Sequence, residues 1–306
     1  VVVLFGGGND KKGYFITVVV LALLAFVTLQ SGFFTTKEVV PVSPKKVPFK
    51  KTLMAVLKNK HLLIVIAVQI CSIGISAYGI MLPYFSKWNL ANSFSFGKFS
   101  VESILIPALS TATGVVYMIA VMITPYILKL GSKKKMFIIM SVMGFVFNVI
   151  SFFCGYENMI LFICIRVLAH IPPTITATIA SYMIMDCLDY AEYETGERTE
   201  GSTFAVNNLI MKIGNAVFSS MVMLILGLVG YNAALNEPAL RMGEHMMHNY
   251  PEMLGGIFAL MTGAPAIGCI LQIIPMAFYK LSDKKVDDMV AELKVRRAAS
   301  KETQEA

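Results

Sequence analysis

Long apolar stretches alternate with short polar segments along the whole chain. Five stretches hold no formal charge and reach the ~20 residues with which an α-helix crosses a bilayer. They are residues 15–34, 62–86, 103–128, 136–156 and 253–279. Two more, 158–185 and 202–231, would match them but for one charge each, Arg166 and Lys212. The pattern predicts an all-α membrane protein with seven transmembrane helices, because a β-barrel would show short alternating segments instead.

The composition agrees with this prediction, since only 15% of the 306 residues are charged and 56% are hydrophobic. About a quarter of the residues in a soluble domain are charged. The chain begins with Val, and no basic region with a short apolar core and a cleavage site follows, so we expect a piece of a longer chain. The five cysteines stand within or at the ends of the predicted helices without CxxC spacing, so we expect neither disulfides nor a metal cluster.

The Lys and Arg residues of the loops predict the orientation, because positive charge is retained on the cytoplasmic side of a membrane. Nineteen of the 26 lie in segments 35–60, 129–135 and 186–200 and in the tail from Lys280, and only five lie in the loops of the other side. We therefore expect a multi-pass protein of the plasma membrane, with the N-terminus of this chain outside and its C-terminus in the cytoplasm. The net charge of +7 is then explained by the lysines and arginines that orient the chain in the lipid bilayer. No nucleic-acid partner is expected.

The longest connection, residues 35–60, contains three prolines and a lysine cluster, which is typical of an extended linker. We expect this linker to separate two helical bundles. Residues 1–34 are then the last helix of a first bundle, 61–280 form a six-helix bundle, and 281–306 form a cytoplasmic tail. Apolar residues at i, i+3, i+4 and i+7 predict a helix on the membrane surface in the first half of the tail, before a disordered end: Val286, Met289, Val290 and Leu293.

Lys212 lies about ten residues into its apolar stretch, which at ~1.5 Å per residue places it near the middle of the bilayer. An ammonium group at that depth costs roughly 2.5–3.5 kcal/mol and normally faces a polar cavity or a carboxylate. Asn208 and Asn215 lie about one turn to either side on the same helix face. These polar neighbours favour a cavity over a buried ion pair that only locks two helices together.

The neighbouring stretch carries Arg166 and His170, four residues apart, and then Pro172 and Pro173. The prolines lack backbone N–H donors and predict a break in the helix at membrane depth, where broken helices line cavities. A lone histidine is more often a satisfied core residue, but beside Arg166 we expect His170 to line the cavity. No Asp or Glu lies within any predicted span, so we expect the partner of Lys212 on helices that this chain lacks.

The polar stretch "DCLDYAEYETGERTEG" at residues 186–201 holds six carboxylates and one arginine. Asp186, Asp189 and Glu192 recur at i, i+3, i+6 and share a face if the preceding helix continues into the cytoplasm. The basic turn "LKLGSKKK" lies on the same predicted side of the membrane. One interpretation is a solvated acidic turn, and the functional one is a set of salt bridges between the two segments that closes the cavity from inside.

The longer stretch "DCLDYAEYETGERTEGSTFAVNNLIMKIGNA" resembles the signature of the melibiose permease-like glycoside-pentoside-hexuronide:cation symporter family, within the major facilitator superfamily. The matching positions are Asp186, Asp189, Tyr190, Glu192, Thr195, Gly196, Arg198, Glu200, Gly201 and Lys212. The resemblance implies a twelve-helix transporter, monomeric at full length, of which this chain covers helices six to twelve. It also implies symport of a small sugar with Na⁺, Li⁺ or H⁺ by alternating access.

The resemblance also implies roles for individual residues. Lys212 is expected beside the sugar and cation sites, with Asn208 one turn earlier. We group both with Asn215, Arg166 and His170 as the candidate substrate and cation site. The candidate cytoplasmic gate combines the signature with the basic turn: Asp186, Asp189, Tyr190, Glu192, Arg198, Glu200, Lys133 and Lys134. Most cation and sugar contacts of the family are acidic residues of its first four helices, which this chain does not include.

Other classes of membrane protein fit the sequence less well. A receptor or a retinal protein would carry an extracellular cysteine pair or a lysine in its last helix. HExxH, GxSxG and Cys-His groupings are absent, so we expect no enzyme and no cofactor. His245 and His248 give only a weak metal-like spacing, and we expect no metal beyond a transported Na⁺. A major facilitator transporter of a non-sugar solute, such as a lysolipid or a drug, and a non-transporting truncated remnant stay open as alternatives.

Overall fold

The computed structural model describes residues 10–35, 54, 56–90, 95–96, 99–196, 200–232 and 250–305. The chain divides into two units, Val1–Lys46 and Val47–Ala306. Among the described residues, seven helices are long and apolar enough to cross a membrane, one in the first unit and six in the second. These helices coincide with the seven predicted stretches. The prediction of an all-α protein with seven transmembrane helices is therefore confirmed.

The first unit contains helix α2 (Asp10–Thr35), whose residues 15–34 carry apolar side chains all around the helix axis. A helix of this kind suits a lipid environment. The hydroxyl groups of Thr28, Ser31 and Thr35 donate to backbone carbonyls about one turn earlier in the same helix. Each of these polar groups is thus satisfied within the helix, as the interior of a bilayer requires.

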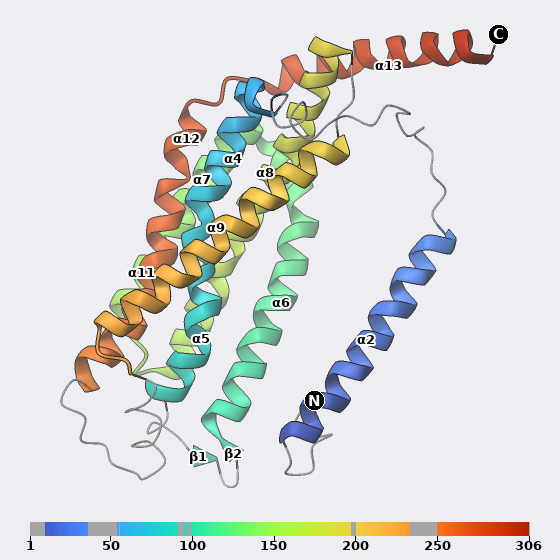
Figure 1. Ribbon diagram of the computed structural model, residues 1–306. Coiled ribbons are helices and arrows are strands. Elements are labelled where there is room, and N and C mark those ends of the chain that lie inside the picture. The colour runs from blue at the N-terminus through green and yellow to red at the C-terminus, as the bar shows by residue number, and fades with distance from the viewer. Residues whose placement is uncertain are drawn as a thin grey trace. The chain divides into compact units, whose positions relative to one another are not determined.

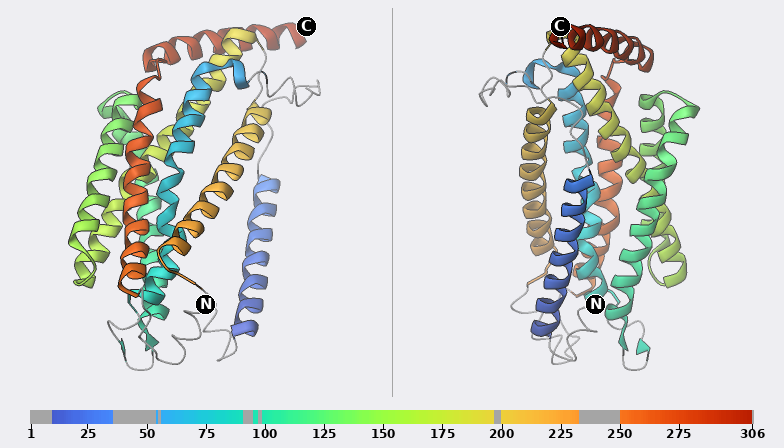
Figure 2. Two further views of the ribbon diagram at one scale, coloured as in Figure 1. Left: turned by 60° about the vertical axis from the view of Figure 1, so that its left-hand side comes forward. Right: turned by 90° about the vertical axis from the view of Figure 1, so that its right-hand side faces the viewer.

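The second unit is a bundle of six membrane-length segments, and a further helix, α13 (Asp283–Glu305), lies across one end of it (Figure 1, Figure 2). One segment combines α4 (Lys60–Ser72), the 3-10 helix η1 (Ile73–Ser76) and α5 (Ala77–Trp88). The others are α6 (Val101–Ile127), α7 (Lys133–Cys154), α8 (Met159–Thr195), α9 (Glu200–Leu228) and α11 (Tyr250–Leu271) with the short α12 (Ile273–Ala277). The short connections include η2 (Leu128–Leu130) and the antiparallel strands β1 (Ser95–Phe96) and β2 (Phe99–Ser100). We call the end covered by α13 the α13 end of the bundle.

Side-chain caps determine where several helices begin and end. Asn59, Ser132 and Asn158 each accept a hydrogen bond from the backbone N–H three residues further on, at the starts of α4, α7 and α8. These residue types supply the oxygen that the first amides of a helix lack. At the other end of α8, Gly196 adopts a φ of 70° and donates its N–H to the carbonyl of Glu192. Glycine reaches this left-handed conformation without steric cost, which lets the chain leave the helix.

Helix α8 continues through Pro172 and Pro173, so the predicted break at membrane depth is wrong. A proline ring fixes φ near −65°, a value that an α-helix also uses, so the cost is confined to the missing N–H groups and local crowding. Threonine hydroxyls satisfy carbonyls in this part of the helix. Thr174 donates to the carbonyl of His170 at 2.8 Å, and Thr176 donates to that of Pro173 at 2.9 Å. Neither bond reaches the carbonyls of Leu168 and Ala169, which lose the donors that the two prolines lack, and α8 still remains one helix of 37 residues.

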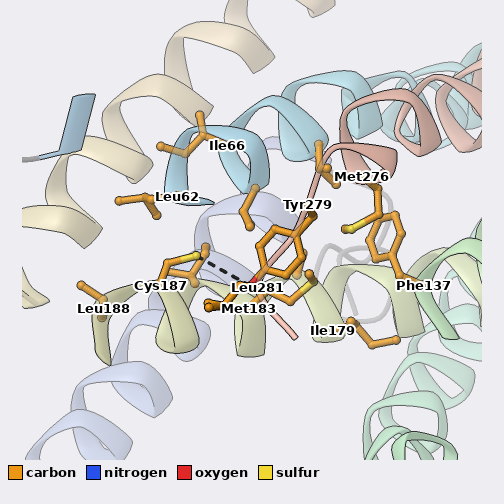
Figure 3. Packing of buried hydrophobic residues seen from close by; sticks show 14 of the residues in the cluster. Leu62, Ile66, Phe137, Ile179, Met183, Cys187, Leu188, Met276, Tyr279 and Leu281 are labelled. Carbon is orange, nitrogen blue, oxygen red and sulfur yellow. Dashed lines mark hydrogen bonds between the residues drawn. The ribbon is translucent and has the colours of Figure 1, made fainter. Parts of the chain in front are cut away.

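Two hydrophobic clusters fill the bundle. One lies toward the α13 end and includes Phe137, Met183 and Cys187 (Figure 3). In this cluster the hydroxyl of Tyr279 lies 4.0 Å from the sulfur of Cys187. The second cluster is rich in aromatic rings, and Phe85 packs at its centre against other rings with centroids 5.2–6.0 Å away.

The amphipathic face predicted for the tail is confirmed by burial. Val286, Met289 and Leu293 of α13 are 5%, 4% and 3% exposed, and Val290 is half-buried. Val286 and Met289 belong to the hydrophobic cluster at the α13 end, so this helix packs on the bundle. The helix also runs to Glu305, so the predicted disorder of its second half is wrong.

Glycines allow α11 to approach η1 closely. A Cβ atom added at Gly268 would stand 3.0 Å from the backbone nitrogen of Ile75 and 3.2 Å from the carbonyl carbon of Gly74. A Cβ atom added at Gly74 would likewise stand 3.0 Å from the carbonyl oxygen of Ala264. The closest of these neighbours are backbone atoms, which cannot rotate away as a side chain can. Small residues at such contacts are typical of helix packing within membranes.

We expect the substitution Gly268→Ala to lower the free energy of unfolding by about 1–2 kcal/mol, because the added methyl group forces two backbones apart. Gly263→Ala on the same helix is the matched control, since nothing lies within 4 Å of its Cβ position. Alanine also has a higher helix propensity than glycine, so this control variant should lose no stability. Denaturant unfolding in detergent micelles measures both variants. Equal stability of the two variants would contradict the importance of the contact.

Candidate functional site

The six-helix unit contains a pocket of about 180 Å³, bordered by η1, α5, α6, α7, α8 and α11. We call it the Arg166 pocket. Its lining residues are Ile75, Tyr78, Tyr117, Asn148, Arg166, Ala169, His170, Pro173, Thr174, Ala177 and Pro265. Most of this surface is apolar, and a few polar groups converge on it from α5, α7 and α8. That combination is typical of small-molecule sites.

Arg166 is the most buried charge of the pocket, with only 1% of its surface exposed. Its Nη1 donates to Oδ1 of Asn148 at 2.9 Å, and its guanidinium carbon lies 4.4 Å from the ring centroid of Tyr78. Its Nε has no hydrogen-bond partner. Among the described residues, no Asp or Glu forms an ion pair with Arg166. The guanidinium is thus held at Nη1 by an amide oxygen and on one face by an aromatic ring, and no described carboxylate neutralises its charge.

His170 lies one turn after Arg166, and its ring centroid is 4.4 Å from that of Tyr78. Its Nδ1 is 3.0 Å from the carbonyl oxygen of Arg166. A carbonyl can only accept, so Nδ1 carries a hydrogen, and in a neutral imidazole Nε2 is then left as an acceptor. The pocket therefore combines guanidinium donors with an imidazole acceptor on one face of α8.

The other three residues of the predicted substrate and cation site lie elsewhere. Lys212, Asn208 and Asn215 are exposed on α9, and none of them lines the Arg166 pocket. Asn215 donates to the carbonyl of Met211 at 2.9 Å, and Lys212 has no ion-pair partner among the described residues. Within the part of the chain that the structure describes, the five residues do not line one pocket, and their grouping as a substrate and cation site stays a prediction.

The packing of α9 explains this separation. The helix turns Gly214 toward the bundle, where an added Cβ would stand 2.6 Å from the Cδ1 of Ile73. Val206 and Val222, eight residues to either side of Gly214, are also buried. Lys212 precedes Gly214 by two residues and so points about 200° away from this face. The same α9 face that carries the three polar residues is therefore turned away from the bundle.

The candidate gate residues gather at the α13 end of the bundle. The ammonium of Lys133 lies 2.5 Å from a carboxylate oxygen of Asp186, and their side chains are only 24% and 12% exposed. The backbone N–H of Lys133 donates to Asp283, the first residue of α13, at 3.0 Å. A carboxylate at a helix N-terminus satisfies amides that lack an intrahelical partner. The start of α7 is thus tied to both α8 and α13.

Arg297 of α13 completes this group of charges. Its guanidinium donates to both carboxylate oxygens of Glu192, at 2.8 and 2.6 Å, and to Asp189 at 3.3 Å. The hydrogen bond with Glu192 raises the pKa of Arg297. Asp186, Asp189 and Glu192 therefore do share one face of α8, and each takes a basic partner. We call Lys133, Asp186, Asp189, Glu192 and Arg297 the end cluster.

The remaining candidate gate residues have different surroundings. Lys134 donates to the backbone carbonyls of Ala277 and Tyr279 at 2.7 and 2.8 Å, so it caps the end of α12. It forms no salt bridge with the described part of the acidic stretch. The ring of Tyr190 lies edge-on to His61, 5.0 Å between centroids, and Lys285 sits 5.4 Å from it. Glu200 begins α9. Arg198 lies outside the described residues.

Three residues that matter for these sites were not singled out from the sequence. Asn148 and Tyr78 hold the guanidinium of Arg166, and Arg297 joins α13 to α8. A single asparagine within an apolar span was a usable signal for Asn148. Two arginines one turn beyond an amphipathic stretch were a weaker signal for Arg297. Tyr78 gave none, because an aromatic residue in a membrane helix is common.

Comparison with known proteins identifies similar sequences over nearly the whole chain. The family model described as MFS/sugar transport protein matches residues 1–283. The uncharacterized symporter YjmB of Bacillus subtilis is 29% identical over 93% of the chain, and the isoprimeverose transporter of Lactiplantibacillus pentosus is 26% identical over 96%. The glucuronide carrier protein homolog of Escherichia coli is 24% identical over 93%. The chain spans 58% of the length of each of these relatives.

Proposed function

Because the chain belongs to the MFS/sugar transport protein family, we propose that it supplies seven transmembrane helices of a symporter that carries a sugar together with a cation. The names of two relatives support the sugar, since one is an isoprimeverose transporter and another a glucuronide carrier homolog. The chain spans 58% of these relatives, so we assign the activity to the whole protein. Na⁺, Li⁺ and H⁺ are the coupling ions that we consider.

We further propose that the α13 end of the bundle faces the cytoplasm in the plasma membrane. Among the described residues, the Lys and Arg residues of the turn before α7, of the start of α7 and of the tail lie at this end. Cytoplasmic loops carry such an excess of positive charge. The beginning of α4, the end of α8 and α13 also lie together at this end (Figure 2). The N-terminus of α2 then lies outside, because a single span separates it from the linker.

The proposed mechanism is alternating access, in which two helical bundles rock about a site near the middle of the membrane. The observation that carries it is Lys212, a charge in the middle of a transmembrane helix with no carboxylate partner among the described residues. Such a charge is costly in lipid and normally serves a transport site. We assign Lys212 and Asn208 to the sugar and cation site, and the end cluster to a gate on the cytoplasmic side.

The test is uptake of labelled glycosides by proteoliposomes that contain the protein, with and without an inward Na⁺ or proton gradient. We expect accumulation that disappears when the gradient is collapsed. Lys212→Gln should reduce coupled uptake at least about tenfold, because it removes charge-assisted hydrogen bonds worth ~1.5–3 kcal/mol. Lys135→Gln, an exposed lysine near the start of α7, is the control and should retain uptake.

Two outcomes would contradict parts of the proposal. Uptake that is equal with and without every gradient would exclude symport. Unchanged coupling in Lys212→Gln would show that Lys212 is not part of the sugar and cation site, without contradicting the proposed transport activity. A panel that includes lysolipids and hydrophobic amines tests the non-sugar alternative in the same assay.

A further inference from the structure

Two neighbouring parts of the bundle have apolar outward surfaces. Between residues 139 and 150 of α7, the exposed side chains are Ile139, Val142, Met143, Val146 and Ile150. Between residues 267 and 278 of α11 and α12, they are Ile267, Ile270, Leu271, Ile274, Ala277 and Phe278. The polar side chains of these stretches are turned inward, since Ser141, Asn148 and Gln272 are only 1–2% exposed. Exposed apolar surface of this extent marks a contact with lipid or with another protein.

The two surfaces meet along a seam between α7 and the α11–α12 segment. The side chain of Gln272 donates to the hydroxyl of Ser141 at 2.9 Å. Two turns earlier on α7, the ammonium of Lys134 donates to the carbonyls of Ala277 and Tyr279 at 2.7 and 2.8 Å. We call this line of contact the α7–α12 seam. It reaches the α13 end of the bundle at Lys134.

Positive charge is concentrated where the seam reaches the α13 end. The two stretches of chain that meet there, residues 128–135 and 277–285, hold seven lysines and one Asp. Of these lysines, Lys133 is paired with Asp186 of α8. The single acid, Asp283, accepts a hydrogen bond from the backbone N–H of Lys133. Most of the positive charge in the two stretches is therefore left without a carboxylate from the same stretches.

Lys134 and Lys280 are the lysines placed at the seam by the observed contacts. Lys280 follows Tyr279 directly, and the carbonyl of Tyr279 accepts from Lys134. Lys280 is exposed and Lys134 is half-buried, and neither forms an ion pair among the described residues. Two carbonyls occupy two of the three donors of the Lys134 ammonium, which leaves one donor for a further acceptor. Because these carbonyls already hold the ammonium in place, an anion that binds there orders it little further.

We propose that the α7–α12 seam binds an anionic phospholipid, with its phosphate at Lys134 and Lys280 and its acyl chains along the exposed apolar faces of α7, α11 and α12. Basic sites between transmembrane helices bind anionic lipid headgroups in this way. The lysines favour the phosphate, and the adjoining apolar surface favours a molecule with acyl chains over a free anion. The inference goes beyond the proposed transport function, because it is the same for any transported solute.

The experiment measures lipid binding to the purified protein. Native mass spectrometry in detergent counts bound lipids while dioleoyl phosphatidylglycerol or dioleoyl phosphatidylcholine is titrated. These lipids have the same acyl chains, but only the first carries a net negative charge. We expect the first phosphatidylglycerol to bind at least about tenfold more tightly than the first phosphatidylcholine, as the attraction of two lysines for an anionic lipid predicts. Equal affinities would overturn the proposal.

Substitutions of the two lysines make the test specific. Lys280→Gln and Lys134→Gln should each reduce the preference for phosphatidylglycerol about fivefold, and the double variant should lose most of it. Glutamine at position 134 can still donate to a carbonyl, and gel filtration and the thermal midpoint verify folding. Lys294→Gln is the matched control, because this exposed lysine lies eleven residues beyond Asp283, about 16 Å further along α13. A preference that survives in folded Lys280→Gln and in the folded double variant would overturn the proposal.

Two further results distinguish other occupants of the seam. Displacement of phosphatidylglycerol by millimolar inorganic phosphate would show a site for small anions and overturn the proposal. Dimers of the protein that take up no phosphatidylglycerol would show that a second copy covers the seam, and would also overturn it. Lipid binding needs neither a sugar nor a gradient. Loss of coupled uptake in proteoliposomes would therefore refute symport and leave this result unchanged.

Discussion

Replacing Lys133 by Met is expected to lower the free energy of unfolding by about 2–3 kcal/mol. The side chain of Asp186 is only 12% exposed, and without the ammonium 2.5 Å away its carboxylate would be left nearly unpaired in the bundle. Removing one partner of a buried ion pair costs ~3–5 kcal/mol, and the partial exposure of Lys133 reduces this value. Denaturant unfolding in detergent micelles measures the loss.

The three consecutive lysines at the start of α7 supply the controls for this prediction. Lys135→Met should change stability little, because Lys135 is exposed and forms no ion pair among the described residues. In Asp186→Asn the remaining Lys133 can turn toward solvent, so this variant should lose less than Lys133→Met. The double variant should be more stable than the sum of the two losses predicts, since it buries no unpaired charge. Additive losses would show that the pair contributes nothing.

Replacing Glu192 by Lys is expected to release α13 from α8. The substitution removes both short hydrogen bonds of Arg297 and places a second positive charge beside it. Bonds of this type contribute ~1.5–3 kcal/mol when shielded, and the 39% exposure of Arg297 places the expected loss near the lower end, about 2 kcal/mol. Backbone amides in residues 286–293 should then exchange hydrogen for deuterium about 30-fold faster, which mass spectrometry measures.

A charge swap tests whether this contact is specific. The double variant Glu192→Lys with Arg297→Glu should restore most of the protection, because the ion pair is rebuilt with the opposite polarity. Lys294→Glu on the same helix is the matched control, since Lys294 is exposed and has no ion-pair partner among the described residues. If the swapped variant exchanges as fast as Glu192→Lys alone, Arg297 does not hold the helix.

The sequence predicted the fold more completely than the site. Membrane crossing depends on the length and apolarity of one segment at a time, so seven spans could be recognised without knowledge of their packing. The shared face of Asp186, Asp189 and Glu192 was also predictable, because it follows from helical spacing within a single helix. Their partners were predicted only in part, since Lys133 pairs with Asp186 but Lys134 caps α12.

Which side chains line the pocket depends on the rotation of each helix about its own axis relative to its neighbours. The sequence of a single helix does not specify that rotation. Lys212 and Arg166 both sit deep in membrane spans, and only the packing of Gly214 on Ile73 turns the first away from the pocket. The double proline was misleading for a related reason. Its cost to the helix could be estimated, but whether neighbouring groups absorb that cost depends on the local structure of α8.

Because α8 is continuous from Met159 to Thr195, a tilt of the helix near one end displaces the other end. Arg166 and Asp186 are twenty residues apart, roughly 30 Å along a straight helix at ~1.5 Å per residue. A tilt of about 5° at the pocket would then move Asp186 by roughly 2.5 Å, enough to carry a short ion pair beyond hydrogen-bonding distance. A small tilt of α8 near Arg166 would thus produce a larger displacement at the end of α8 that contacts α13. A spectroscopic label on α13 would therefore detect small tilts of α8.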